Sequence, residues 1–326
     1  MTERIACVGA GRMGRGMAIA FAYAGMPVTL IDLKARSADA WARLSAEAAG
    51  EVRSSLQLLA QLGAVPADAV ERIAARIRLV PDDAADAALA AATVIFEGVP
   101  ETLQAKREAL ARVCAAATAD AIIASTTSTI LVTDLVPLVT QPERLINAHW
   151  LNPAYIIPLV ELSAHDGTSP AVRQRLRALL EGIGKVTVEC GPAPGYIVPR
   201  LQALIMNEAA RMVEEGVATP QDIDKATRYG LGLRFAAMGV VEFIDFGGND
   251  ILYHASRYLS RTLSAERYTA PAIVDTMMAE GRNGLKSGQG FYDYRGIDVD
   301  AYRLDVLQRT LGMLKHADLF KAPVTD

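Results

Sequence analysis

Cysteine is scarce in this chain of 326 residues, and long apolar runs are absent. Cys7, Cys114 and Cys190 are widely separated, and the sequence has no CxxC pair and no Cys/His cluster at metal-ligand spacing. We therefore expect reduced, mostly buried thiols and no bound metal. No apolar stretch reaches the roughly 20 residues of a membrane span. A first structured segment near Arg4 leaves no room for a signal peptide, so we expect a cytoplasmic protein without a membrane partner.

The sequence also lacks an excess of either charge. Its 33 Lys and Arg residues and 37 Asp and Glu residues give a net charge of −4, with both signs mixed along the chain. Without a basic face, binding to a nucleic-acid backbone is not expected. Hydrophobic residues make up 51% of the chain, which is enough to bury the core of a globular protein. The length of 326 residues suits about two domains at roughly 150 residues each.

The N-terminal part alternates between strand and helix signals. Helical patterns include one over 37–78 that is broken at 63–66, which predicts an inserted helical hairpin, and two more at 102–117 and 170–183. The alternation predicts an α/β fold, a Rossmann-type doubly wound parallel sheet. Its strands are expected from short β-prone apolar runs at 4–8, 28–32, 77–80, 93–97, 121–124, 145–149, 158–162 and 186–189.

A Pro/Gly cluster over 190–195 marks the end of this alternation and predicts a domain boundary. We therefore expect an α/β domain over 1–190 and an all-α domain over 191–326. Leu201, Leu204 and Ile205 lie on one apolar helix face, which predicts a core or dimer contact. Helices of the second domain are expected at 199–215, 220–229, 236–246, 250–263, 270–280 and 298–315.

A glycine-rich turn follows the first predicted strand and opens the first helix, in the pattern G-x-G-x-x-G. Gly9 permits a tight turn, Gly11 lets the backbone approach a pyrophosphate, and Gly14 lets helix and strand pack closely. The helix N-terminus would stabilise the phosphate charge. Asp32 stands 18 residues after Gly14 at the end of the second strand, where a carboxylate can bind ribose hydroxyls. This context predicts a dinucleotide site that also includes Arg12 and Met13.

Asp32 also bears on which dinucleotide binds. Its carboxylate would repel the 2′-phosphate of NADP, so NAD is the expected cofactor. Lys34 and Arg36 lie close by and leave NADP open as an alternative, although surface charges at the start of a helix are the simpler interpretation.

A second constellation begins at His149, which alone among the four histidines ends an apolar run. Ligands of open α/β sheets bind at the carboxyl ends of such strands. A strand returns 12 residues later with Glu161, so the imidazole and the carboxylate could lie side by side. A neutral imidazole can take the proton of a secondary alcohol while hydride leaves, and the carboxylate would hold the ring tautomer. We predict a His149–Glu161 catalytic pair.

These motifs occur together in one known family. Over nearly its whole length the sequence resembles the NAD-dependent 3-hydroxyacyl-CoA dehydrogenases, which also have a Rossmann domain and a helical C-terminal domain. Beyond the glycine turn, the resemblance is carried by the segments 94–101 (VIFEGVPE), 125–128 (STTS), 149–153 (HWLNP), 194–198 (PGYIV) and 284–292 (GLKSGQGFY).

The resemblance implies roles for further residues. Ser128 would hydrogen-bond the substrate oxygen, Asn152 would support the site, and Glu101 and Lys106 would lie on the ribose and nicotinamide side of NAD. Without the resemblance, Ser128 would be a turn residue and the other two an exposed helix pair. The C-terminal helices would form a dimerisation domain and one wall of the substrate cleft, so a homodimer is expected.

The sequence departs from the family pattern in two places. Pro199 stands where the family has an Asn in the substrate site, so a polar contact to the acyl carbonyl is missing. A proline in the first turn of a helix is a structural explanation for the same residue. Family members that bind CoA present basic residues on the inserted hairpin, whereas the turn 62–69 has none. A small carboxylate is therefore expected in place of a long acyl-CoA.

The segments 229–235 (YGLGLRF), 239–248 (GVVEFIDFGG) and 250–258 (DILYHASRY) are similar to a branch of the family that acts on small carboxylates. The branch includes L-gulonate 3-dehydrogenase (lambda-crystallin), carnitine 3-dehydrogenase and 5-formyl-3-hydroxy-2-methylpyridine-4-carboxylate 5-dehydrogenase of vitamin B6 degradation. Arg234, beside a glycine-rich turn, is a candidate anchor for a carboxylate; a surface or interdomain salt bridge is the alternative.

The leading hypothesis is an NAD-dependent dehydrogenase of a 3-hydroxy acid or 3-hydroxyacyl substrate. A pyridine alcohol or aldehyde carboxylate is an alternative substrate, and a non-catalytic NAD-binding structural protein is an alternative of another class.

Overall fold

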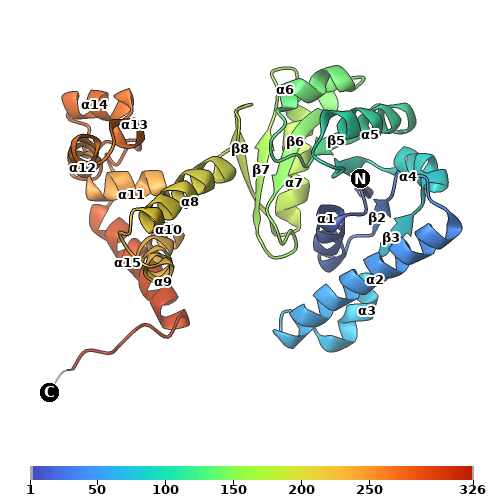
Figure 1. The fold of residues 1–326 in the computed structure, drawn as a ribbon, viewed down its shortest axis with the longest axis horizontal. Coiled ribbons are helices and arrows are strands. Elements are labelled where there is room, and N and C mark those ends of the chain that lie inside the picture. Colours follow the sequence, from blue (N-terminus) through green and yellow to red (C-terminus); the bar gives the residue numbers. More distant parts are fainter. Residues whose placement is uncertain (1–2, 325–326) are drawn as a thin grey trace. The chain divides into compact units, whose positions relative to one another are not determined.

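The computed structural model describes residues 3–324, and the chain forms two compact units, one ending at Met206 and the other beginning at Asn207. The first unit is α/β and the second is all-helical, as predicted (Figure 1). Helix α8 (Val198–Glu214) contains the boundary between them. No helix within the described part of the chain is long and apolar enough to cross a membrane.

One eight-stranded sheet organises the first unit, in the order β3-β2-β1-β4-β5-β6-β7-β8 (Figure 1). All neighbouring strands are parallel except β6 and β7, which are antiparallel because a short loop lets the chain turn straight back. The strands are β1 (Ile5–Val8), β2 (Val28–Ile31), β3 (Ile77–Val80), β4 (Val94–Glu97), β5 (Ile122–Ser125), β6 (Leu145–Trp150), β7 (Leu159–Ser163) and β8 (Val186–Cys190).

Alternating side chains of the strands build two cores, one on each face of the sheet. In β1, Ile5 and Cys7 belong to one core and Ala6 and Val8 to the other. The first core is completed by helices α1 (Arg12–Tyr23), α2 (Ala38–Gln61), α3 (Val70–Ala74) and α7 (Pro170–Gly182). The second is completed by α4 (Ala85–Ala91), α5 (Leu103–Ala116) and α6 (Val132–Leu135).

The inserted hairpin is present but unequal in its two arms. Ser37 caps α2 by accepting a hydrogen bond from the amide of Ala40, and α2 then runs for 24 residues. The returning arm is only a 3-10 turn (Ala67–Ala69) followed by α3, because the chain must be extended again to enter β3. The hairpin packs over the β2–β1 side of the sheet through α1.

The burial of the three cysteine thiols agrees in part with the prediction. Cys7 is fully buried, but Cys114 and Cys190 are only partly buried, since one lies late in α5 and the other ends the edge strand β8. All three are free. Among residues 3–324 no cluster of three or more His, Cys, Asp or Glu side chains could hold a metal ion.

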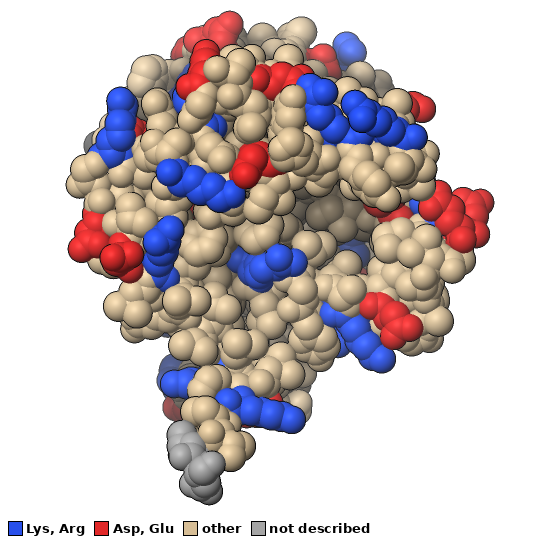
Figure 2. Space-filling model, turned by 90° about the vertical axis from the view of Figure 1, so that its left-hand side faces the viewer, with Lys and Arg blue, Asp and Glu red and all other residues tan. Residues whose placement is uncertain are grey.

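The second unit consists of helices, and the predicted helix over 220–229 is interrupted. After α9 (Pro220–Lys225) the backbone widens into a π-helical segment (Ala226–Gly232) before α10 (Leu233–Ala237). Figure 2 shows Lys and Arg scattered among Asp and Glu on one face of the molecule, with uncharged surface between them. The remaining helices are α11 (Val240–Gly247), α12 (Asn249–Thr262), α13 (Ala265–Tyr268), α14 (Ala272–Ala279) and α15 (Val299–His316).

Candidate active site

The glycine turn between β1 and α1 is as tight as its sequence predicts. Gly9 has a φ of 102°, and a Cβ there would lie 2.6 Å from the carbonyl oxygen of Gly98. A Cβ on Gly14 would lie only 1.9 Å from the carbonyl oxygen of Gly9. Gly11, in contrast, has no atom within 4 Å of such a position, so its backbone faces open space.

That open space is a cavity of about 860 Å³ at the carboxyl ends of β1, β2 and β4. Gly9, Gly11, Arg12, Met13 and Asp32 all line it. No side chain caps the N-terminus of α1, so its free amides can bind an anion. An open glycine backbone, an uncapped helix start and a ribose-facing carboxylate fit the diphosphate and adenosine parts of NAD.

Asp32 is buried and forms an ion pair with Arg36, which also lines the cavity. The interpretation of Arg36 as an isolated surface charge at the start of a helix is therefore wrong, because it pairs with Asp32 at the cavity. A second cation, Arg15, was not predicted; it is buried in α1, donates to the carbonyl of Ala10 at 2.8 Å and pairs with two glutamates of α2. The glycine motif directs attention to positions 9–14 and gives no signal for residue 15.

His149 and Glu161 are brought together by the antiparallel pairing of β6 and β7, in which they are direct partners. Nδ1 of His149 lies 2.7 Å from Oε2 of Glu161, and the two side chains are 5% and 0% exposed. The other carboxylate oxygen accepts hydrogen bonds from the amides of Ile197 and Val198 at 2.9 and 2.8 Å, where α8 begins. An acceptor at Nδ1 favours a proton on that nitrogen and leaves Nε2 free to accept one.

The charge state of Glu161 follows from these contacts. Burial by itself raises the pKa of this carboxyl, but the hydrogen bonds from His149, Val198 and Ile197 act more strongly in the opposite direction. The net pKa of Glu161 lies below its usual range, so the side chain is a carboxylate at neutral pH. It can therefore stabilise a proton that arrives on the imidazole.

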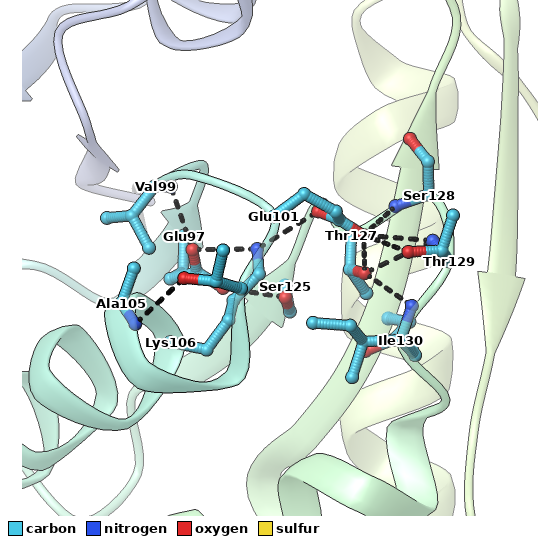
Figure 3. A network of polar contacts seen from close by, with 12 residues as sticks. Glu97, Val99, Glu101, Ala105, Lys106, Ser125, Thr127, Ser128, Thr129 and Ile130 are labelled. Carbon is cyan, nitrogen blue, oxygen red and sulfur yellow. Dashed lines mark hydrogen bonds and ion pairs between the residues drawn. The ribbon is translucent and has the colours of Figure 1, made fainter.

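Lys106 and Glu101 belong to a polar network at the ends of β4 and β5 (Figure 3). Nζ of Lys106 is buried and lies 3.0 Å from Oε1 of Glu97 and 3.7 Å from Oε2 of Glu101. Glu97 is fully buried and also accepts a hydrogen bond from Ser125 at 2.6 Å. The interpretation of Glu101 and Lys106 as an exposed helix pair is therefore wrong for the lysine, because its main partner is an interior glutamate on a strand.

Glu101 fixes the turn that carries Ser128. Its Oε1 accepts hydrogen bonds from the amides of Ser128 and Thr129, both at 2.9 Å, and from the hydroxyl of Thr127. Burial raises the pKa of Glu101. The hydrogen bonds from the turn and the charge of Lys106 lower it by more, so the net pKa lies below its usual value. The side chain of Ser128 points away from the network and is exposed (Figure 3).

Two further predicted residues lie on the first unit. Asn152 is exposed in the loop between β6 and β7, three residues after His149. Pro199 is the second residue of α8, where a helix tolerates proline because the amide lacks an intrahelical partner.

Arg234 belongs to the helical unit and lies in α10, directly after the π-helical segment. It is exposed, donates to the carbonyl of Gly230 at 2.8 Å and has its guanidinium 5.0 Å from the ring centre of Phe243. Within residues 3–324 it forms no ion pair, so the alternative of a salt bridge is not realised by a carboxylate of the described chain.

Comparison with known sequences agrees with this geometry. The profile of "3-hydroxyacyl-CoA dehydrogenase, NAD binding domain" matches residues 4–193, and that of the C-terminal domain of the same enzymes matches residues 195–294. The chain belongs to the 3-hydroxyacyl-CoA dehydrogenase family. It is therefore an NAD-dependent dehydrogenase that acts on CH–OH groups, and the predicted cofactor, fold class and family are confirmed.

Relatives in this family differ in substrate. The chain is 32% identical over 295 residues to 5-formyl-3-hydroxy-2-methylpyridine 4-carboxylate 5-dehydrogenase of Mesorhizobium japonicum, covering 90% of this chain and 91% of the relative. It is 34% identical to L-carnitine dehydrogenase of Streptomyces coelicolor, covering 83% and 82%. The crystal structure of 3-hydroxyacyl-CoA dehydrogenase from Archaeoglobus fulgidus superposes with a TM-score of 0.75 at 27% identity, covering 98% of this chain and all of that one.

Proposed function

We propose that this dehydrogenase oxidises the 3-hydroxyl group of a small free carboxylic acid, with NAD as hydride acceptor. The observation that carries the proposal is the buried His149–Glu161 pair at a sheet edge shared with the dinucleotide cavity. A hydroxyl can lose hydride from its carbon only if its proton is removed, and the free Nε2 of His149 suits that step.

The residues divide the reaction between them. Nε2 of His149 takes the hydroxyl proton while the C–H bond breaks and the carbonyl forms, and the Glu161 carboxylate stabilises the resulting imidazolium. Bound NAD⁺ supplies the acceptor for the hydride. The exposed hydroxyl of Ser128 donates a hydrogen bond to the substrate oxygen. Asn152, which also follows the carboxyl end of a strand at this edge of the sheet, supports it. Glu101 lies toward the ribose and nicotinamide half of the cofactor, and the buried Lys106 supports it through their ion pair.

The inserted hairpin supports a substrate without CoA. Arg53 pairs with Glu71 at 3.0 Å and Arg72 with Asp68 at 3.0 Å, so these cations are already neutralised. Arg15 is likewise held by glutamates of α2. These three arginines are therefore not free cations for the phosphate groups of CoA. Pro199, which has neither an amide hydrogen nor a polar side chain, adds no contact to a thioester carbonyl.

A pyridine alcohol or aldehyde carboxylate is a second candidate substrate, favoured by the Mesorhizobium relative, whose name states such a compound. Both candidates carry a free carboxylate. We assign its anchor to Arg234, whose exposed guanidinium forms no ion pair within residues 3–324. The non-catalytic alternative is not retained, because the family is enzymatic.

We also propose that residues 1–190 bind NAD and that residues 191–326 bind substrate and mediate formation of a homodimer. Support for the second role comes from α8, which has no fully buried residue although one of its faces is apolar. On that face Leu201, Leu204 and Ile205 are 43%, 64% and 45% exposed.

Matched substrates test the proposal. NADH formation is measured with 3-hydroxybutyrate, 3-hydroxybutyryl-CoA and a pyridine alcohol carboxylate. We expect kcat/KM for a free acid to exceed that for the thioester at least about tenfold, which corresponds to one well-placed ionic contact. A preference of that size for the CoA substrate would overturn the inference from the hairpin.

Arg234 has its own test. Arg234→Gln should raise KM for the free acid about tenfold or more and leave KM for NAD unchanged, because only the carboxylate contact is lost. Arg228→Gln, which removes an exposed arginine from the same segment, is the control and should change neither value. Equal effects of the two substitutions would show that Arg234 is not the anchor.

A further inference from the structure

Tyr196 occupies the space between His149 and the turn that carries Ser128. Its ring stacks on the imidazole, with 5.0 Å between the ring centres and 6° between the planes. It is 8% exposed and has a φ of 45°, a left-handed backbone conformation that residues with side chains rarely adopt. Such a conformation persists only where the surrounding structure determines it.

The hydroxyl of Tyr196 both donates and accepts a hydrogen bond. It donates a hydrogen bond to the carbonyl of Thr127 at 2.9 Å and accepts one from Nδ2 of Asn147 at 3.0 Å. The same Nδ2 donates to the carbonyl of Ile130 at 3.0 Å. Only an NH₂ group can serve both partners, so the orientation of the buried Asn147 amide is fixed by its contacts.

These hydrogen bonds hold the Ser128 turn at both ends. Thr127 and Ile130 flank it, and their carbonyls are bound from the side of the sheet by Tyr196 and Asn147. Glu101 binds the amides of Ser128 and Thr129 inside the turn (Figure 3). The turn is thus bound through both its carbonyls and its amides while the hydroxyl of Ser128 stays exposed.

Asn147 and Tyr196 also belong to the framework of the base. Asn147 precedes His149 by two residues on β6, so the two side chains lie on the same face of the sheet. Tyr196 directly precedes the two amides, those of Ile197 and Val198, that hold the Glu161 carboxylate. One phenol therefore contacts the imidazole through its ring and the serine turn through its hydroxyl.

We infer that Tyr196 and Asn147 are positioning residues, which set the distance between the proton acceptor His149 and the hydroxyl of Ser128. The ring orients the imidazole, and the hydroxyl, with the Asn147 amide, places the turn that binds the substrate oxygen. This inference rests on the proposed roles of His149 and Ser128, and it assigns separate kinetic effects to the two parts of the tyrosine side chain.

The test separates the ring from the hydroxyl. Tyr196→Phe keeps the ring, so KM for the hydroxy acid should rise about 3–10-fold, the size expected for a lost neutral hydrogen bond, while kcat changes less than about twofold. Tyr196→Leu removes the ring as well, and kcat should fall at least about tenfold. KM for NAD should stay unchanged in both variants. Tyr23→Phe removes a hydroxyl that donates to the carbonyl of Ala64, outside the site, and should match the wild type.

A double variant tests the coupling. Asn147→Ala and Tyr196→Phe both remove the hydrogen bond between these two residues, and each also removes one bond to the turn. The combined effect should therefore be smaller than the sum of the two single effects. Full additivity would overturn the pairing of these residues. Wild-type KM and kcat in Tyr196→Phe, or a parallel loss of NAD binding, would overturn the positioning role and leave a structural one.

Hydrogen–deuterium exchange gives a readout that does not need a substrate. The amides of residues 127–130 should exchange faster in Tyr196→Phe than in the wild type, and no faster in Tyr23→Phe. Unchanged exchange in Tyr196→Phe would contradict the inference even if the proposed function holds. A further outcome is a wild type that oxidises none of the hydroxy acids while exchange in Tyr196→Phe still rises as expected. In that case the proposed function fails, but the positioning of the 127–130 turn by Tyr196 is supported.

Discussion

At the scale of single residues, the pair of His149 and Glu161 could be predicted because both belong to strands that the sequence marks clearly. A histidine at the end of one apolar run and a glutamate in the next need only an antiparallel return to become neighbours. The partners of the second Glu161 oxygen could not be predicted in this way. They are backbone amides at the start of α8, which any residue type could provide.

The same limit applies to Tyr196 and Asn147. No local pattern links positions 147, 196 and 127–130, and their contacts exist only once β6, the turn before α8 and the loop after β5 have come together. Arg15 was missed for a related reason, since its partners lie on the inserted hairpin. Long-range polar contacts of this kind depend on tertiary structure, so the sequence alone gives no signal for them.

Glu161 gives a prediction about pH and stability. Its pKa is lower in the folded protein than in the unfolded chain, so the carboxylate stabilises the fold fully above the unfolded value, near 4.3, and less as pH falls through the lowered value. The wild type should therefore exceed Glu161→Gln in free energy of unfolding by a constant amount between pH 6 and 8. The difference should shrink as the pH falls from about 5 to 3, as measured by urea unfolding.

The control for this experiment is Glu266→Gln, which changes an exposed glutamate of α13. Its difference from the wild type should be small at every pH. A gap between wild type and Glu161→Gln that stays the same from pH 8 to pH 3 would show that the ionised carboxylate does not stabilise the fold.

At the scale of elements, the strands were predictable because each is a short β-prone run, and the inner strands are also buried on both faces, which is typical of parallel sheets. The edge strands β3 and β8 are only partly buried. Helix α4 was not expected, because an alanine-rich segment has little contrast between its faces. The second arm of the hairpin is shorter than its sequence pattern, since β3 begins within it. The π-helical segment contains Gly230 and Gly232, and a 3.6-residue period cannot reveal a wider turn.

The glycine turn gives a prediction for an element. Gly14→Ala places a methyl group within 1.9 Å of a backbone oxygen, so β1 and α1 must move apart. We expect a destabilisation of about 1–3 kcal/mol and an NAD dissociation constant raised at least about tenfold. Thermal unfolding with and without NAD measures both effects.

Gly50→Ala is the matched control, since Gly50 is exposed in the middle of α2 and an added methyl there meets no atom within 4 Å. Alanine is the better helix former, so this variant should be about 0.5–1 kcal/mol more stable and bind NAD normally. Similar behaviour of the two variants would refute the close approach at Gly14.

At the scale of the whole molecule, composition predicts two domains and no single-sign charged face, but not the number of subunits. The exposed apolar residues of α8 are the physical basis for the proposed homodimer.

Leu204→Asp should produce a monomer in sedimentation velocity at micromolar concentration, because an unpaired charge in an apolar interface is costly. Leu62→Asp, at a leucine of the hairpin turn that is also more than half exposed, should remain dimeric. A monomeric wild type, or a dimeric Leu204→Asp variant, would contradict this interface.

In the proposed dehydrogenation, His149 removes the proton of the substrate hydroxyl. The most direct test is the turnover of His149→Ala with the preferred hydroxy acid, together with NAD binding by fluorescence. Removal of a general base predicts a fall in kcat of about 10²–10⁴, with the NAD dissociation constant within about twofold of the wild type. A His149→Ala enzyme that turns over at the wild-type rate would contradict the claim.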